Sequence, residues 1–354
     1  MNRKEKLLML VMMIATFPTF GQKYNPAYRY ADAYKQYQNA NCPLEKDSIK
    51  HFVYFSRDRA LIHDHVFLQV QRLEGAQIMY SWRELEPKKG EYDFSMIHED
   101  YKYLTSYGKK LFIQLQDVSF RASYKAVPGY LLTDEFDGGC VASNEEEGWV
   151  AKRWNPKVQD RWAKLLVALG KEFDGKIEGI NLQETAAGSS DEKDTSFTPE
   201  RYVECIKENM SALKTAFPNS VTMQYANFMP GEWLPWDDKG YLRAIYQYGN
   251  DIGVGLGGPD LMVHRKGQLN HLITMMHENV YTVPLGIAIQ DGNYTGKTGA
   301  DKDYNEKKDN GKNRDNNIVP LLHAFAKDFL KVNYMFWVNQ EPYFTGDVVP
   351  CLNN

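Results

Sequence analysis

The chain has 354 residues, of which 43% are hydrophobic and 13% aromatic, and its formal net charge is -4. This apolar content supports a large core, and the length suits one (β/α)8 barrel. The negative charge argues against a nucleic-acid partner, because such a partner requires a basic surface.

The first 21 residues have the pattern of a secretory signal peptide. A basic start is followed by an apolar run over 7–15, and small residues lead to Gly21. We expect cleavage after Gly21 and export of a mature domain, residues 22–354, to the periplasm or the outside of the cell. The apolar run is too short to span a bilayer, so no stable membrane insertion is expected, and retention as an anchor is the alternative.

Four cysteines can become oxidised in an exported chain. Cys42 and Cys351 lie near opposite ends of the sequence. The two ends of a closed barrel lie close together, so this pair is the first choice for a disulfide. Whether Cys140 and Cys205 form a second bond is left open. Connectivity does not follow from sequence, and four free thiols are the alternative.

Eight short β-rich runs alternate with helical segments along the mature chain. The runs cover residues 51–57, 76–82, 110–116, 177–184, 221–228, 252–258, 283–290 and 332–340. Apolar periodicity predicts helices near 60–73, 95–107, 157–173, 198–216, 238–249, 266–277 and 316–329. Strands that alternate with helices predict a parallel sheet, and eight of them predict an α/β fold with a single closed (β/α)8 TIM barrel over about 50–345.

Polar and aromatic side chains gather where these strands end, which is where such barrels build their active sites. Amides and carboxylates hydrogen bond to hydroxyl groups, and aromatic faces pack against sugar rings, so a carbohydrate partner is expected. Ordinary strand ends that face solvent are the alternative. Glycine at every second position of 253–257 is interpreted as room beside the sixth strand. The candidate substrate-binding residues are Trp82, Arg83, Glu84, Gln114, Gln116, Asn181, Gln183, Tyr225, Asn227, Gln290, Trp337 and Asn339.

The stretch WRELEPKKGEYDF at 82–94 resembles the second-strand signature of clan A glycoside hydrolases, the group of β-galactosidases, cellulases and xylanases. The resemblance covers the barrel as a pattern, over about 50–345. It implies hydrolysis by two carboxyl groups, one that protonates the leaving oxygen and one that attacks the anomeric carbon or activates water. It further implies that Glu184, which ends the fourth strand, is the general acid/base and that Trp337 is the sugar platform.

Two positions depart from that pattern. Gln183 occupies the place where Asn is usual, and the seventh strand, LGIAIQDGNY, has no glutamate for the nucleophile. Asp291 is the nearest carboxylate, although strand alternation favours an inward Gln290. Glu341 shares its parity with Trp337 and is the other candidate. Asp291 before a glycine also fits a turn, and Glu341 before a proline also fits a loop.

Two motifs resemble metal sites, but neither is complete. His63-Asp64-His65 has paired histidines, but the motif falls in the first expected helix and not at a strand end. Asp301, Asp303 and Asn305 have the spacing of a calcium loop, but Lys312 stands where the closing glutamate belongs. No metal and no cofactor are therefore expected.

Long segments at 117–154 and 291–317 follow the third and seventh strands and are expected to wall the site or to serve as simple cover. The leading hypothesis is an exported glycoside hydrolase of a poly- or oligosaccharide, with Glu184 and either Asp291 or Glu341 as its carboxylates. The alternative is a non-catalytic carbohydrate-binding protein on a hydrolase-like barrel, which the missing glutamate favours.

Overall fold

Eight parallel strands close into a barrel in the order β1-β11-β10-β9-β8-β7-β3-β2. The structure, a computed structural model, describes residues 25–143, 148–186, 194–299, 301, 303–304 and 317–353. The strands are β1 (Lys50–Tyr54), β2 (Leu73–Ser81), β3 (Lys110–Gln116), β7 (Gly179–Leu182), β8 (Val221–Tyr225), β9 (Gly255–Gly258), β10 (Leu285–Ile289) and β11 (Tyr334–Val338). All eight expected strands are present, so the predicted (β/α)8 barrel is confirmed. The expected signal segment lies outside the described residues.

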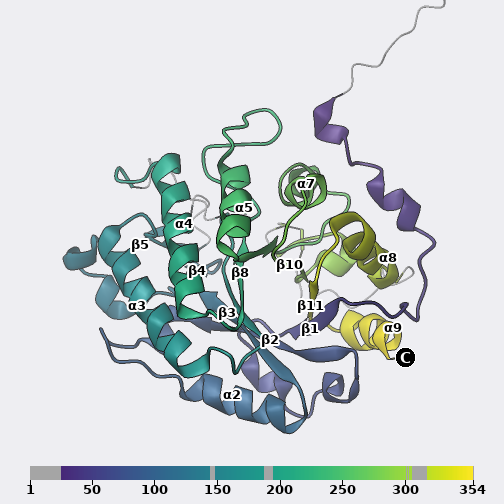
Figure 1. Cartoon of the computed structure of the whole chain (residues 1–354), viewed down its shortest axis with the longest axis horizontal. Helices are drawn as coiled ribbons and strands as arrows, with labels where there is room; N and C mark the ends of the chain where they lie inside the picture. Colours follow the sequence, from purple (N-terminus) through teal and green to yellow (C-terminus); the bar gives the residue numbers. More distant parts are fainter. Residues whose placement is uncertain are drawn as a thin grey trace, which may run out of the picture.

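Helices surround this barrel (Figure 1). They are α2 (Ser95–Ser106), α3 (Pro156–Phe173), α4 (Pro199–Ala216), α5 (Tyr241–Ile252), α6 (Lys266–Asn270), α7 (Leu272–Glu278), α8 (Val319–Ala324), which continues as the π-helix Phe325–Leu330, and α9 (Val349–Leu352). Local sequence sets their starts: at α3 the Asn155 side chain accepts the Lys157 and Val158 amides, and a proline follows. Among the described helices, none is long and apolar enough to cross a membrane.

The prediction of a helix over 60–73 is wrong. Two short 3-10 helices, Arg59–Ile62 and Val66–Gln69, connect β1 to β2 instead. Asp64 between them has a φ of 53°, in the left-handed region that a continuous helix cannot contain. Most apolar residues of the segment, Ile62, Phe67, Leu68, Val70 and Leu73, are nevertheless buried, which explains why their spacing looked helical.

Aromatic rings fill the interior of the barrel. The rings of Phe52, Phe112 and Phe336 lie with centroids 5.0, 5.8 and 6.0 Å apart. At the β9 side the backbones themselves are close, because a Cβ on Gly257 would lie 2.0 Å from the carbonyl oxygen of Gly286. The glycines of β9 therefore permit close packing, and the interpretation that they leave open room is wrong.

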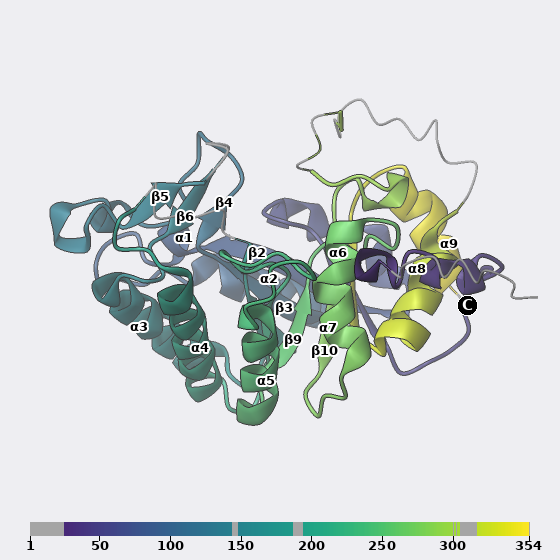
Figure 2. The same cartoon turned by 90° about the horizontal axis from the view of Figure 1, so that it is seen from above.

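The insertion after β3 forms a small antiparallel sheet in the order β4-β6-β5. Its strands are β4 (Val118–Ser119), β5 (Cys140–Ala142) and β6 (Trp149–Ala151). Figure 2 shows this sheet projecting from the barrel beyond α3. The described part of the insertion therefore forms a wall on one side of the molecule.

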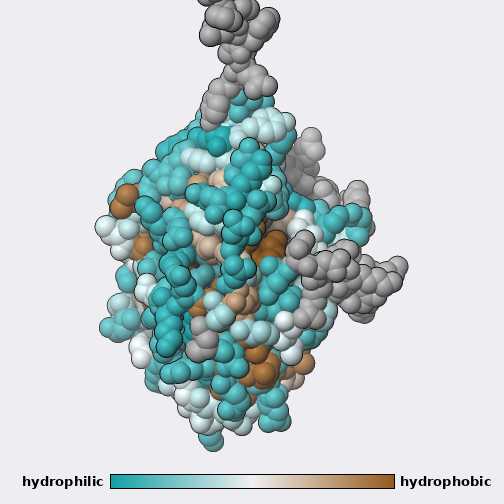
Figure 3. Space-filling view, turned by 90° about the vertical axis from the view of Figure 1, so that its right-hand side faces the viewer, coloured by the Kyte–Doolittle hydropathy of each residue, from teal (hydrophilic) through white to brown (hydrophobic). Residues whose placement is uncertain are grey.

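The segment that leads into β1 contacts the C-terminal helix α9. Cys42 and Cys351 form the disulfide that was the first choice, and the Leu44 amide donates to the Cys351 carbonyl at 2.9 Å. Cys140 and Cys205, whose pairing the sequence left open, are free thiols. The face that carries α8 and α9 is mostly hydrophilic with small apolar patches (Figure 3).

Candidate active site

Three carboxylates lie where β7, β9 and β10 end. Glu184, Asp260 and Asp291 follow these strands in turn, and each side chain is partly exposed. All three negative charges act on Tyr54, the last residue of β1. Burial raises the pKa of Tyr54 far above its ordinary value, and the charges of Asp291, Glu184 and Asp260 raise it further. The four groups therefore share one small region at the mouth of the barrel.

Glu184 is held in a site that keeps its carboxyl group protonated to near neutral pH. Burial, helped by the charge of Asp260, raises its pKa to about 7, although Asn227 and Arg153 act in the opposite direction. The Asn227 Nδ2 donates to Glu184 Oε2 at 2.6 Å. Arg153 donates to the Glu184 carbonyl at 2.9 Å and is neutralised by Asp117. A carboxyl group with such a pKa has the property required of a general acid.

Asn227 has only one orientation that satisfies its neighbours. Its Oδ1 accepts the backbone amides of Ala186 at 3.2 Å and Phe228 at 2.9 Å. The Nδ2 must then point at Glu184. This sequence-predicted binding residue therefore positions the predicted acid.

Asp260 is the residue that sequence reasoning missed. It follows Gly-Gly-Pro at the end of β9 with a φ of 62°, which is uncommon outside glycine and is often found at functional sites. Burial raises its pKa to about 6, while Asn293 and Arg265 oppose that shift. Asn293 Nδ2 donates to Asp260 Oδ1 at 2.8 Å. Its place directly after the sixth strand is the sequence signal that could have found it.

Buried amides line the barrel beneath the carboxylates. Gln77 Nε2 donates to Asn181 Oδ1 at 2.9 Å and to the Tyr225 hydroxyl at 3.0 Å. The Oε1 atoms of Gln77, Gln114 and Gln116 have no hydrogen-bond partner among the described residues. Buried acceptors of this kind require a donor, which water or a sugar hydroxyl can supply.

The two predicted tryptophans do not face the mouth. Trp337 is fully buried on the outer side of β11, where its Nε1 donates to His51 Nδ1 at 3.1 Å. Trp82 donates to Glu86 Oε2 at 2.8 Å and packs on Trp162 with centroids 4.9 Å apart. The structure thus contradicts the expected role of Trp337 as the sugar platform, and Trp82 belongs to the packing against α3.

Two other predicted binding residues, Gln183 and Glu84, have structural roles because their side chains accept hydrogen bonds from backbone amides. Gln183 is buried and its Oε1 accepts the Asp117 and Val118 amides at 3.0 and 2.7 Å, which fixes the start of the insertion. Glu84 is exposed on the short helix α1 (Trp82–Leu85), where it forms a capping box with Ser81. These two side chains are committed to backbone partners.

Glu341 lies in its own loop, exposed, and accepts a hydrogen bond from the Thr345 hydroxyl. This geometry agrees with the loop alternative. Asn339 Oδ1 lies 3.0 Å from His65 Nε2, in the same outer region. Gln290 is partly exposed beside Asp291, and its backbone amide donates to Asn293 at 2.8 Å.

The loop from β8 to α5 carries two exposed tryptophans. Trp233 and Trp236 are 55% and 63% exposed. The loop is nevertheless anchored, because the Glu232 carboxylate accepts two amides at the start of α5, at 3.0 and 2.7 Å. Trp233 also stacks on Phe228, with centroids 5.7 Å apart and planes 9° apart. An aromatic surface therefore adjoins Asn227, the partner of Glu184.

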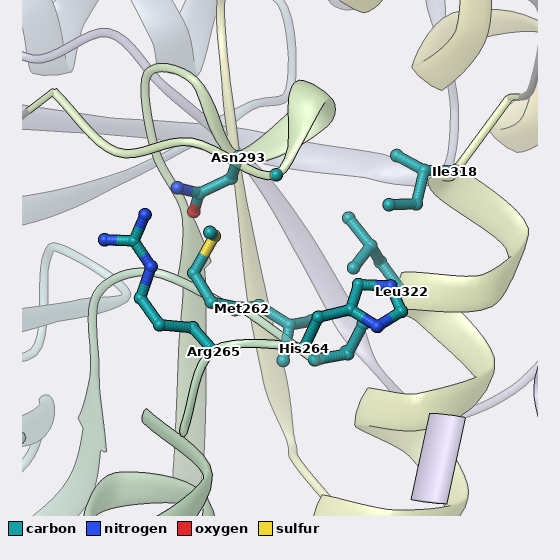
Figure 4. A pocket seen from close by; sticks show the side chains of 9 residues that line it. Met262, His264, Arg265, Asn293, Ile318 and Leu322 are labelled. Carbon is teal, nitrogen blue, oxygen red and sulfur yellow. The ribbon is translucent and has the colours of Figure 1, made fainter. Parts of the chain in front are cut away.

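A cavity of about 190 Å³ lies beside Asn293 (Figure 4). Most of its lining is apolar and comes from the segment after β9 and from α8. Because Asn293 also binds Asp260, the cavity adjoins the carboxylate cluster. Its lining residues are Leu261, Met262, Val263, His264, Arg265, Asn293, Gly296, Ile318 and Leu322.

A separate cluster of Asp47, His51 and His323 lies on the outer side of β1, with candidate ligand atoms within 4.8 Å of one another. Asp47 Oδ2 lies 2.8 Å from His323 Nε2. The Trp337 indole donates to His51 Nδ1, so the neutral ring carries its proton on Nε2 and offers no free lone pair to a cation. Burial and the charge of His323 lower the pKa of His51 to about 3. The cluster therefore ties the N-terminal segment to α8.

The two incomplete metal motifs of the sequence also form no site within the described residues. His63 and Asp64 are exposed. Asp301 and Asp303 each form an ion pair with a basic side chain. Asn305 lies outside the part that the structure describes.

Comparisons with known proteins identify the fold. No family model matches the sequence, and no curated protein sequence is similar to it. The catalytic domain of beta-amylase from Paenibacillus polymyxa superposes with a TM-score of 0.56 at 9% identity, covering 87% of this chain and 98% of that chain. Endo-glycoceramidase II from Rhodococcus sp. superposes with a TM-score of 0.52 at 12% identity, covering 88% and 81%. Both neighbours are glycoside hydrolases, so the chain has the barrel that the clan A resemblance predicts.

Proposed function

We propose that the protein is a glycoside hydrolase in which Glu184 is the general acid/base. The observation that carries this proposal is the position of Glu184 at the end of β7, where Asn227 donates to its carboxylate and where burial and the charge of Asp260 raise its pKa to about 7. Glycoside hydrolysis requires one carboxyl group that is protonated and one that is ionised in the same site. The fold shared with glycoside hydrolases supports the proposal, although fold alone does not define an activity.

Asp260 is the preferred second carboxylate. Its charge acts directly on Glu184, whereas the charge of Asp291 acts on Tyr54. Burial raises the pKa of both groups, and the charge of Asp260 raises that of Glu184 further, which favours an ionised Asp260 beside a protonated Glu184. Glu184 then protonates the leaving oxygen as the bond from the anomeric carbon to that oxygen breaks. Ionised Asp260 either bonds to the anomeric carbon or takes a proton from the attacking water.

Sugar binding is supported by two features of the mouth. The amide oxygens of Gln114 and Gln116 lack donors within the described residues. The exposed rings of Trp233 and Trp236 offer the apolar faces on which sugar rings stack. These groups surround the same strand ends that carry the carboxylates.

The test is a screen of glycan hydrolysis with matched carboxamide variants. The purified parent, Glu184→Gln, Asp260→Asn, Asp291→Asn and Glu341→Gln are incubated with plant and microbial glycans, and released sugars are separated by chromatography. We expect the Glu184 and Asp260 variants to lose about 100-fold or more in rate, and Glu341→Gln to keep the parent rate. Release that survives Glu184→Gln contradicts the assignment. Binding without release, equal in parent and Glu184→Gln, leaves the non-catalytic carbohydrate-binding alternative, which the missing seventh-strand glutamate favours.

We also propose that the protein is exported after removal of residues 1–21. The disulfide between Cys42 and Cys351 supports an oxidising compartment. Mass spectrometry of the N-terminus from fractionated cells tests this proposal. A mature chain that begins at Gln22 outside the cytoplasm is expected, and an intact N-terminus in the cytoplasm contradicts it.

A further inference from the structure

Three arginines at the barrel mouth have no carboxylate partner among the described residues. The described chain contains eleven arginines, and eight of them form ion pairs with Asp or Glu, which leaves three. The three are Arg57, Arg83 and Arg121. Arginines elsewhere in the described chain, on helices and in loops, are paired, so the exception is confined to one place.

That place is one sector of the mouth. Arg57, Arg83 and Arg121 follow β1, β2 and β3, which are adjacent in the barrel. Around the ring of eight strands, β2 lies four positions from β9 in either direction. The strand that leads to Arg83 is therefore directly opposite the strand that leads to Asp260. A positive sector thus faces the carboxylate cluster across the mouth.

One aromatic ring holds two of these cations in place. The guanidinium carbons of Arg57 and Arg83 lie 4.1 and 5.9 Å from the centroid of Tyr124. The Tyr124 hydroxyl donates to Ser81 Oγ at 2.8 Å, which fixes the ring at the end of β2. A π-face attracts a cation but does not neutralise it. The two guanidinium groups are therefore oriented in advance and retain their charges.

We propose that this site takes an acidic glycan whose carboxylate or sulfate groups bind Arg57 and Arg83. This inference rests on the proposed function and names its substrate class. The planar guanidinium donates two parallel hydrogen bonds to either kind of oxyanion. A neutral sugar would leave two like charges uncompensated at the mouth. Because the chain as a whole has a net charge of -4, a local positive sector is needed to admit a polyanion.

The test measures binding apart from turnover, in the Glu184→Gln background. The probes are polygalacturonate for carboxylates, κ-carrageenan for sulfates, and galactan and agarose as their neutral counterparts, with affinity electrophoresis as the readout. We expect an acidic probe to bind in preference to its neutral counterpart. The double variant Arg57→Gln/Arg83→Gln should weaken that binding about tenfold or more. Arg243→Gln, which removes a paired arginine on α5, is the matched control and should bind as the parent does.

Further variants and substrates separate the possible failures. Arg83 is exposed, so Arg83→Lys should fold normally, keep the charge, lose the paired hydrogen bonds and weaken binding to a smaller extent. Acidic-glycan binding that is unchanged in the double variant overturns the proposal, as does binding of the neutral probes alone. Acidic binding with no hydrolysis by the parent refutes the proposed activity and leaves this inference standing. Hydrolysis of neutral glycans alone supports the proposed activity and refutes the inference of an acidic substrate.

Discussion

Glu184 and Asp260 are two neighbouring carboxyl groups with different tasks. Burial is the largest cause of the raised pKa in both, and for Glu184 the charge of Asp260 adds to it. Because the two groups interact, their protons leave in two steps that belong to the pair. The residue that ionises first can act as nucleophile or base while the other remains an acid.

Turnover should depend on pH through both carboxyl groups. The rate constant kcat/KM should rise as pH passes about 6, where Asp260 ionises, and fall as pH passes about 7, where Glu184 loses its proton. Measured from pH 4 to pH 9, kcat/KM should therefore follow a narrow bell-shaped curve. A rate that still increases above pH 8 contradicts the role of Glu184 as the acid.

The second prediction concerns stability. The folded state holds the Glu184 proton up to a pH of about 7, whereas the ordinary value is 4.5. Binding of this proton by the folded state stabilises it relative to the unfolded state. That stabilisation is fully present below pH 4.5 and is lost as the pH rises through 7. Glu184→Gln cannot ionise, so it should be more stable than the parent at pH 8 by about 1–3 kcal/mol, with little difference at pH 4.5. Urea unfolding at both pH values checks this, and Glu208→Gln, which changes a surface ion pair, is the control.

The barrel could be predicted because each strand is a short apolar run bounded by polar residues. The linker between β1 and β2 could not, since its buried apolar residues keep helical spacing while Asp64 adopts a left-handed conformation. Trp337 was misplaced because its strand ends in polar residues on both faces, and only packing against His51 shows which face is outer. Asp260 was hidden by the glycines before it. Pattern thus located the strand ends but did not reveal which side chains converge there.

The loop between β8 and α5 carries the third prediction. The double variant Trp233→Ala/Trp236→Ala should keep the fold, because both rings are mostly exposed and Glu232 still anchors the loop. It should raise KM for long glycans about tenfold or more, since each stacked aromatic contributes about 0.5–1.5 kcal/mol. Initial rates against glycan length are the measurement. The aromatic assignment fails if KM is the same for long chains and for disaccharides.

A disulfide bonds the segment that leads into β1 to the C-terminal helix α9. The disulfide joins residues that are 309 positions apart, so it restricts nearly the entire unfolded chain. The Asp47 carboxylate reinforces this closure, because its ion pair with His323, opposed by burial, lowers its pKa to about 2. The N-terminal segment is thereby attached at two points to the last helices of the barrel.

The fourth prediction follows from that closure. The variant Cys42→Ser/Cys351→Ser should lose about 2–5 kcal/mol of unfolding free energy, as measured by urea titration. Activity at room temperature should remain, because the bond lies away from the carboxylates. Cys140→Ser, which alters a free thiol, is the control and should change little. A parent protein whose stability is the same with and without reductant contradicts the prediction.

The uneven burial of the tryptophans allows binding at the mouth to be followed by intrinsic fluorescence. Trp82, Trp154, Trp162 and Trp337 are buried and Trp149 in β6 is partly exposed, whereas Trp233 and Trp236 are mostly exposed at the mouth. Iodide, which cannot enter the core, would quench the red-shifted emission of the two solvent-facing indoles and leave the blue emission of the interior. A glycan laid across the loop would shield those two indoles from the quencher. Occupancy of the mouth can thus be followed by light in unlabelled protein, including variants that no longer turn over.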